Sequence, residues 1–179
     1  MKTTFRFALC LLMGLSILTV SHTSTASANS RKVMVLYKTP VKLPSIQYWN
    51  GSGEVSLESF TGKYVLVNFW ATWCAPCVRE LPSLQSLAQK INSDKFLVIA
   101  ISQDQGAEHV VVPYLKRLKI DNLNVLYDPN RKSFKEFALR GLPTTVLISP
   151  AGKVIARLEG EVAWDSGLIY EQIQKVISN

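Results

Sequence analysis

Residues 68–82 read NFWATWCAPCVRELP and contain two of the chain's three cysteines, Cys74 and Cys77. The apolar run KYVLVNFW (63–70) leads into this stretch, and its β-branched and aromatic side chains predict a buried central strand. After the cysteines, leucine, alanine and isoleucine recur at helical spacing between residues 81 and 91, which predicts an amphipathic helix. The Cys-x-x-Cys pair therefore lies where a buried strand passes into a helix.

Two cysteines at this spacing are compatible with three roles: a structural disulfide, a metal site or a redox pair. A structural disulfide that closes so short a loop stabilises a fold by roughly 2 kcal/mol, against about 4.7 kcal/mol for a loop of 100 residues. A closed zinc site needs four nitrogen or sulfur ligands, whereas Cys74, Cys77 and His109 are the only cysteine and histidine residues after residue 28. Copper(I), which two thiolates can hold, remains a minor alternative.

The position of the pair at a helix start favours redox chemistry. Cys74 would face unpaired backbone N–H groups and the positive end of the helix dipole, which favour the thiolate that attacks disulfides. Pro76 falls in the first helical turn, where the helix does not need its missing N–H. We therefore expect an exposed and acidic Cys74 that attacks a partner disulfide, with Cys77 one turn further in to resolve the mixed disulfide.

The rest of the chain predicts one α/β domain. Strands that alternate with helices and are followed by an antiparallel hairpin imply a mixed sheet with helices on both faces. In the last helix we expect Leu168, Ile169, Ile173, Val176 and Ile177 to point inward. The expected strands span 96–102, 124–128, 144–149 and 154–160, a further hairpin spans 46–57, and the expected helices span 107–120, 130–139 and 164–177.

The first 28 residues are typical of a secretory signal peptide. Lys2 and Arg6 precede an apolar run over residues 7–20, and Ala-Ser-Ala at 26–28 forms a cleavage site. The apolar run is shorter than the roughly 20 residues that a spanning helix needs, which favours cleavage over an uncleaved membrane anchor. The protein is therefore expected in the periplasm or another extracytoplasmic space, and at the membrane only if the leader is uncleaved.

The remaining chain divides into a lead-in segment, 29–43, with one expected edge strand, and a domain over 44–179. The chain's formal net charge is +7, but its basic residues are scattered and form no stripe. A solvated basic surface is therefore favoured over nucleic-acid binding. Export would place the cysteines in an oxidising compartment.

Three stretches resemble the thioredoxin superfamily, and within it the exported TlpA/ResA-like proteins. NFWATWCAPCVRELP (68–82) is similar to that group's active-site stretch, GLPTTVLISPAGKV (141–154) to its second signature, and GEVAWDS (160–166) looks TlpA-like. The resemblance covers about residues 42–177. It implies a thioredoxin fold, with a mixed central sheet flanked by helices, an N-terminal β-hairpin extension and an extra strand–helix insertion.

The resemblance also implies a substrate-binding surface around the cysteines. It implies a cis peptide bond before Pro143. This proline would face the cysteine pair and hold an extended substrate segment beside it. The resemblance further implies that Leu142 helps to tune the reduction potential of the pair. Trp73 places a large ring beside the nucleophile, which suits docking of a substrate peptide. With Ala75 and Pro76 between the cysteines, these residues form the expected substrate-binding set.

Proton transfer is expected to depart from that of thioredoxin. Thioredoxins carry a buried aspartate six residues before the first active-site cysteine, and here that position is Asn68, which cannot titrate. Glu80, six residues after Cys74, is the expected replacement, because ResA-like relatives have a glutamate at this place. The residues alone would favour an ordinary exposed helix glutamate. The resemblance instead implies a partly buried carboxyl with a raised pKa, which acts as general acid and base for Cys77.

The expected activity is thiol–disulfide exchange with exported proteins. The resemblance favours a reductant of disulfides in apoproteins of cytochrome or copper-oxidase maturation, recharged by a membrane thiol carrier. The alternatives are an oxidant that donates its disulfide to folding proteins and a copper(I) chaperone that uses the same cysteines. A peroxidase is disfavoured, because the proline and threonine that peroxiredoxins place before the cysteine are missing. Beyond the redox-active disulfide we expect no cofactor and no resident metal.

Overall fold

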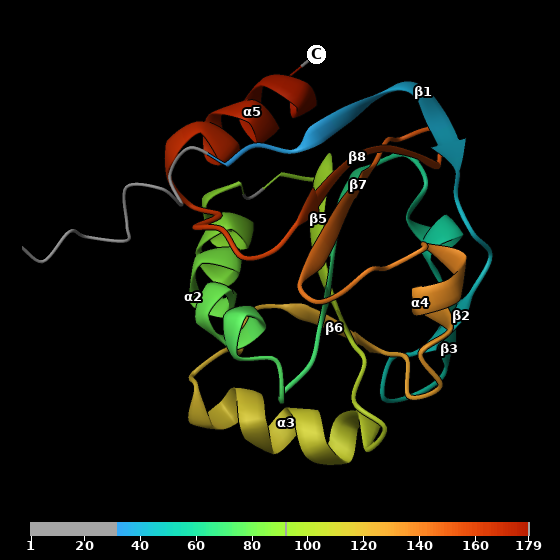
Figure 1. Ribbon diagram of the computed structural model, residues 1–179, viewed down its shortest axis with the longest axis vertical. Helices are drawn as coiled ribbons and strands as arrows, with labels where there is room; N and C mark the ends of the chain where they lie inside the picture. The colour runs from blue at the N-terminus through green and yellow to red at the C-terminus, as the bar shows by residue number, and fades with distance from the viewer. Residues whose placement is uncertain (1–31, 92, 179) are drawn as a thin grey trace, which may run out of the picture.

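The computed structural model describes residues 32–91 and 93–178 (Figure 1). The expected leader, residues 1–28, and the first part of the lead-in segment lie outside these residues. Within them, no helix combines the length and the apolar composition needed to cross a bilayer.

One mixed sheet of eight strands forms the centre of the domain. Its central strand β4 pairs in parallel with β5 on one side and antiparallel with β7 on the other. β6 pairs in parallel with β5, and the remaining antiparallel pairs are β2–β3, β2–β6, β7–β8 and β1–β8. In spatial order the strands are β1 (Val35–Lys42), β8 (Lys153–Glu159), β7 (Thr144–Ile148), β4 (Tyr64–Trp70), β5 (Phe96–Ser102), β6 (Asn124–Tyr127), β2 (Gln47–Trp49) and β3 (Glu54–Ser56).

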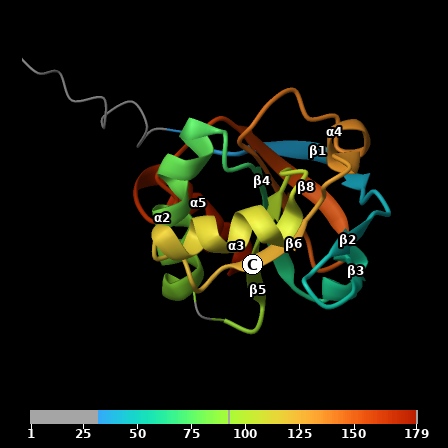
Figure 2. The ribbon, with the colours of Figure 1, turned by 90° about the horizontal axis from the view of Figure 1, so that it is seen from below.

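Helices cover both faces of this sheet, and α2 and α4 lie on opposite sides of it (Figure 1 and Figure 2). Side chains alternate along β4, so that Leu66 and Trp70 pack on the side of α2, α3 and α5, while Val65 and Val67 pack on the side of α4. The helices are η1 (Leu57–Phe60), α2 (Ala75–Lys90), α3 (Ala107–Arg117), α4 (Lys132–Glu136) and α5 (Gly167–Ile177).

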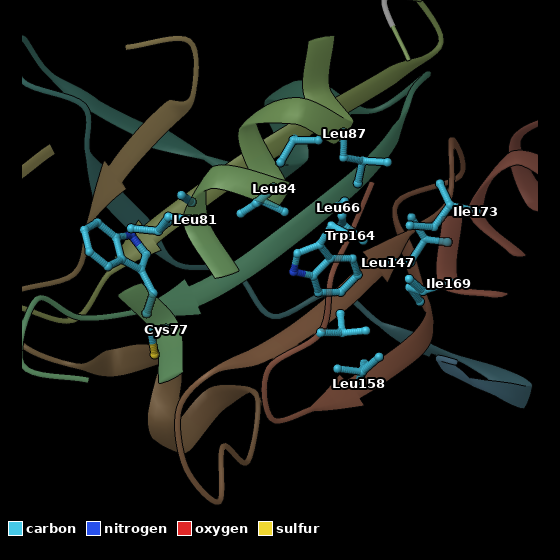
Figure 3. Packing of buried hydrophobic residues seen from close by; sticks show 14 of the residues in the cluster. Leu66, Cys77, Leu81, Leu84, Leu87, Leu147, Leu158, Trp164, Ile169 and Ile173 are labelled. Atoms are coloured by element: carbon cyan, nitrogen blue, oxygen red, sulfur yellow. The ribbon is translucent and has the colours of Figure 1, made fainter. Parts of the chain in front are cut away.

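The larger hydrophobic cluster fixes α2 to the sheet. Leu81, Leu84 and Leu87 of α2 are fully buried, because their three-residue spacing places them on one face of the helix. These leucines belong to the same cluster as Leu66 and Leu147 of the sheet, which Figure 3 also labels. The start of α2, which carries the cysteines, is therefore held by a rigid apolar layer.

The predicted strands and helices are confirmed, with shorter helices than the sequence indicates. The strand expected over 96–102 has those bounds, and the expected hairpin over 46–57 is present as β2 and β3. The helix expected over 130–139 is confined to α4, because Arg131 before it and Ala138 after it adopt left-handed backbone conformations.

One expectation for the last helix is wrong. Leu168 is 48% exposed, whereas Ile169 and Ile173 are fully buried and Val176 and Ile177 pack partly against the core. The four inward residues recur at three- and four-residue spacing, and Leu168 lies about 100° away from Ile169 around the helix axis. Leu168 therefore falls at the solvent side of the apolar face.

Strand β1, from the predicted lead-in segment, forms one edge of the sheet. It pairs with β8 in two short stretches, and the register shifts between Leu36 and Val41. Val35, Leu36 and Val41 are exposed on this strand, and Lys38 and Pro40 lie between the two paired stretches. The edge is therefore irregular and charged.

Candidate active site

The cysteine pair occupies the N-terminus of α2 and forms a disulfide bond. Cys74 is the N-cap residue, with extended backbone, and its Sγ accepts a hydrogen bond from the backbone N–H of Cys77 over 3.3 Å. Pro76 follows in the first turn, as the sequence predicts. After reduction, an N–H group of the helix would point at the Cys74 sulfur and stabilise a thiolate there.

The expected exposure of Cys74 is wrong for the disulfide form. Cys74 is 6% exposed and Cys77 is fully buried, because both cysteines belong to the apolar cluster under α2. Figure 3 shows Cys77 at the start of the helix, close to Leu81. Cys74 is nevertheless the more accessible of the two cysteines.

The carboxyl of Glu80 is buried one turn after Cys77, on the same side of α2. Glu80 is 3% exposed, so the alternative of an ordinary surface glutamate is wrong. Its Oε1 accepts a hydrogen bond from Nδ2 of Asn68 over 2.7 Å, and its Oε2 accepts one from the backbone N–H of Val162 over 3.1 Å. The carboxyl therefore links α2 to β4 and to the loop after β8.

Burial raises the pKa of Glu80 to about 7, and this confirms the predicted direction. The hydrogen bonds from Asn68 and Val162 lower the pKa and offset part of the burial effect, and the indole of Trp164 acts in the same direction without a hydrogen bond of normal geometry. The negative charge of Glu161 raises the pKa further. Glu80 can therefore gain and lose a proton near neutral pH.

Asn68 holds this carboxyl from the sheet. Asn68 is fully buried and faces Thr145 across the β4–β7 ladder. Its Nδ2 donates to Oγ1 of Thr145 over 2.9 Å as well as to Glu80. The sequence shows that Asn68 cannot titrate, but it gives no signal for Thr145 or Val162 as further members of the network.

The structure also locates the expected substrate-binding residues. The Leu142–Pro143 peptide bond is cis, as predicted, with Leu142 half-buried and Pro143 buried. Trp73 is 59% exposed beside Cys74, Ala75 is exposed and Pro76 is half-buried. A cavity of about 190 Å³ is lined by the segment from Arg140 to Thr144, with Glu159 and Gly160 opposite. The binding role of these residues stays a prediction.

Two buried aspartates, which the sequence analysis does not identify, organise the loops around the pair. The carboxylate of Asp104 accepts hydrogen bonds from the backbone N–H and the hydroxyl of Thr72 and from the hydroxyl of Ser102. The carboxylate of Asp128 accepts the backbone N–H groups of Lys132 and Ser133. Thr72 reaches Asp104 from the loop after another strand, whereas the partners of Asp128 follow it four and five residues later in the chain.

Over residues 32–91 and 93–178, no three histidine, cysteine, aspartate or glutamate residues are grouped closely enough to hold a metal ion.

Comparison with known sequences gives a family match and a set of curated relatives. The profile of the AhpC/TSA family matches residues 39–157. The thiol-disulfide oxidoreductase ResA of Bacillus thuringiensis subsp. konkukian is 33% identical over 108 residues, which are 60% of this chain and 61% of that protein. The ResA of Bacillus subtilis is 31% identical over 107 residues, or 60% and 59% of the two chains. The chain thus spans about three-fifths of the curated relatives that it matches.

Solved structures confirm the thioredoxin fold. A candidate thiol:disulfide interchange protein DsbE from Chlorobium tepidum aligns with a TM-score of 0.70 at 26% identity, covering 80% of this chain and 99% of that one. The thioredoxin domain of a thiol-disulfide oxidoreductase from Bacteroides vulgatus aligns with a TM-score of 0.66 at 26% identity, covering 79% and 99%.

Proposed function

The chain belongs to the AhpC/TSA family, and from that membership we propose that this protein is a thiol–disulfide oxidoreductase that cycles Cys74 and Cys77. The observation that carries the proposal is the disulfide at the N-terminus of α2, with a buried carboxyl of raised pKa one turn further along the helix. The names of the curated relatives and of the similar structures support the same chemistry.

The proposed reduction proceeds in two exchange steps. In the reduced protein the Cys74 thiolate attacks one sulfur of a partner disulfide, forming a mixed disulfide and releasing the partner's other sulfur as a thiolate. Glu80 accepts the proton of the Cys77 thiol, and the Cys77 sulfur attacks Sγ of Cys74. The Cys74–Cys77 disulfide forms, the partner leaves with both sulfurs reduced, and two electrons have passed to it.

We propose that the partners are exported proteins with disulfides or oxidised cysteine pairs, of the kind found in cytochrome or copper-oxidase maturation. A membrane thiol carrier would return electrons to the pair, and the protein would act outside the cytoplasm. The resemblance of residues 68–82 to TlpA/ResA-like proteins supports this direction. The disulfide itself would be the only redox group required.

The reduction potential of the Cys74–Cys77 pair distinguishes a reductant from an oxidant. A potential well below the roughly −180 to −210 mV of an oxidising secretory compartment supports the reductant, whereas one near about −120 mV supports donation of the disulfide. Copper(I) titration of the reduced protein tests the chaperone alternative. An affinity no tighter than that of a small dithiol would exclude it.

The catalytic assignment is tested with a synthetic peptide disulfide and dithiothreitol as electron source. The wild type should accelerate peptide reduction, and Cys74→Ser should abolish the acceleration. Cys77→Ser should accumulate a mixed disulfide between Cys74 and the peptide, visible by mass spectrometry. Acceleration that survives in Cys74→Ser would contradict the proposed function.

A further inference from the structure

An arginine lies on the exposed tryptophan next to the nucleophile. The guanidinium carbon of Arg131 is 5.4 Å from the ring centroid of Trp73, although the two residues are far apart in sequence. Trp73 is 59% exposed and directly precedes Cys74. A guanidinium over an indole face is a favourable cation–π arrangement. The positive charge is therefore held within the surface that a substrate must contact to reach the disulfide.

The arginine is positioned by its backbone as well as by its side chain. Arg131 has φ of 53° and ψ of 36°, a left-handed conformation that is unfavourable for a residue with a Cβ. Its backbone N–H donates to the carbonyl of Asp128 over 2.9 Å, and its Nε donates to the carbonyl of Gln103 over 3.1 Å. Gln103 is in turn tied to the end of β4, because its N–H donates to the carbonyl of Trp70. The guanidinium is thus oriented in advance.

The outer edge of this guanidinium is available to a ligand. Arg79, Arg140 and Arg157 each pair with a glutamate, but Arg131 has no carboxylate partner among the residues that the structure describes. Its Nε is used by Gln103, which leaves the terminal N–H donors on an exposed residue. Guanidinium N–H groups held in one plane fit the two oxygens of a carboxylate.

The neighbouring acidic groups do not occupy this edge. The carboxylates of Asp104 and Asp128 are buried and accept hydrogen bonds from loop hydroxyl and backbone N–H groups. Glu108 accepts a hydrogen bond from Nε1 of Trp49 over 2.9 Å. These carboxylates therefore have hydrogen-bond partners other than Arg131.

We propose that Trp73 and Arg131 form a carboxylate-binding subsite, which selects protein substrates that carry an aspartate or glutamate a few residues from the attacked cysteine. The proposal rests on the proposed function, because it names the substrate class of the same site. The indole would pack against the substrate backbone while the guanidinium binds the acidic side chain. Bound this way, the substrate's disulfide is held next to Cys74.

Three peptide disulfides that differ at one position test the subsite. Each carries Glu, Gln or Lys two residues from its cysteines, and kcat and KM are measured with dithiothreitol as electron source. For the wild type we expect a KM about fivefold lower for the Glu peptide than for the Gln peptide, with similar kcat values, because an exposed ion pair contributes up to about that factor. The Lys peptide should have the highest KM, and high salt should reduce the differences.

Variants assign the preference to Arg131. Arg131→Gln should raise the KM for the Glu peptide to that for the Gln peptide, and Arg131→Lys should retain part of the preference. Arg117→Gln is the matched control, because Arg117 is also exposed, lies 5.2 Å from the ring of Tyr114 and has no ion pair within the described ranges. That variant should keep the full preference.

The outcomes separate the subsite from the proposed function. If the wild type reduces all three peptides with equal KM, the subsite is excluded and the oxidoreductase proposal stands. If Arg131→Gln loses activity uniformly toward the three peptides, Arg131 has a structural role and the subsite is excluded. If the wild type reduces none of the peptides, the proposed function fails and the subsite fails with it. The proposal is supported if Arg131→Gln loses the preference for the Glu peptide and keeps its activity toward the Gln peptide, while Arg117→Gln keeps the preference.

Discussion

Asn68 on β4 donates a hydrogen bond of 2.7 Å to the buried carboxyl of Glu80 on α2. The amide thus takes the place that an ionisable group would occupy in thioredoxin, while the proton-binding group stands on the helix with the cysteines. Because the amide cannot titrate, we propose that Glu80 carries the proton exchange of this site.

Replacing Glu80 should change the pH dependence of thiol reactivity. In the wild type, the rate at which Cys77 attacks the mixed disulfide at Cys74 should rise with pH through a transition near the Glu80 pKa of about 7. The ionised carboxylate accepts the proton of the Cys77 thiol. Glu80→Gln should remove that transition and leave the far-UV circular dichroism unchanged. Identical pH profiles of the two proteins would exclude the proton-transfer role.

Stability should fall as pH rises from about 4.5 to above 7. The carboxyl of Glu80 has a folded pKa of about 7 against 4.5 in the unfolded chain, so the folded state binds the extra proton in this range. The free energy of unfolding therefore decreases with pH, by at most about 3 kcal/mol from this group.

Urea unfolding of the disulfide form at pH 5 and pH 8 measures this effect. Glu80→Gln should show a much smaller difference between the two pH values. The pKa values of Glu108 and Glu159 are lowered, so their contributions to the free energy of unfolding are lost at a pH below this range. They therefore do not obscure the effect of Glu80 between pH 5 and pH 8. A wild type whose unfolding free energy rises between pH 5 and pH 8 would contradict the buried, proton-binding state of Glu80.

Asn68→Asp should move the proton exchange to higher pH. A second carboxyl beside Glu80 would leave the pair sharing one proton at neutral pH, because two buried like charges at hydrogen-bond distance repel. The midpoint of the Cys77 rate should rise by about one pH unit or more. Thr145→Val is the matched control: it removes the other partner of Asn68, so its midpoint should stay close to that of the wild type.

The packing of α2 should dominate the stability of the domain. Leu84 is fully buried between α2 and the sheet, and Leu84→Ala should lower the free energy of unfolding by about 2–5 kcal/mol. Leu168→Ala should cost less than about 1 kcal/mol, because Leu168 is 48% exposed. Chemical denaturation of both variants at one pH provides the comparison. Equal losses would show that the burial of these two leucines is misassigned.

The elements that the sequence predicts well are those with a strong local period. The continuous apolar run over β5 predicts a buried strand, and the helical spacing of leucines after Cys77 predicts an amphipathic helix. Both elements form as predicted. The position of the Cys-x-x-Cys pair at the strand–helix junction follows from the same local signals. The cis bond before Pro143 is predicted through the resemblance, because an isolated X–Pro bond favours trans.

The parts that the sequence does not predict depend on distant partners. Thr145 meets Asn68 through the register of β4 and β7, and Val162 reaches Glu80 from the loop after β8. The burial of Cys74 depends on the apolar cluster around the start of α2, which a local helix argument leaves out. Arg131 reaches Trp73 only because the loops after different strands converge at one end of the sheet.

The interrupted pairing of β1 with β8 affects how readily this edge of the sheet can pair with another molecule. A long regular strand with exposed Val35, Leu36 and Val41 would invite neighbouring molecules to add strands, whereas the proline and lysine at its centre oppose that association. If the chain began at the β2–β3 hairpin, β8 would become the outer strand and offer its unpaired N–H and C=O groups to other copies. Light scattering of such a shortened protein should reveal precipitation at concentrations where the full-length protein stays clear.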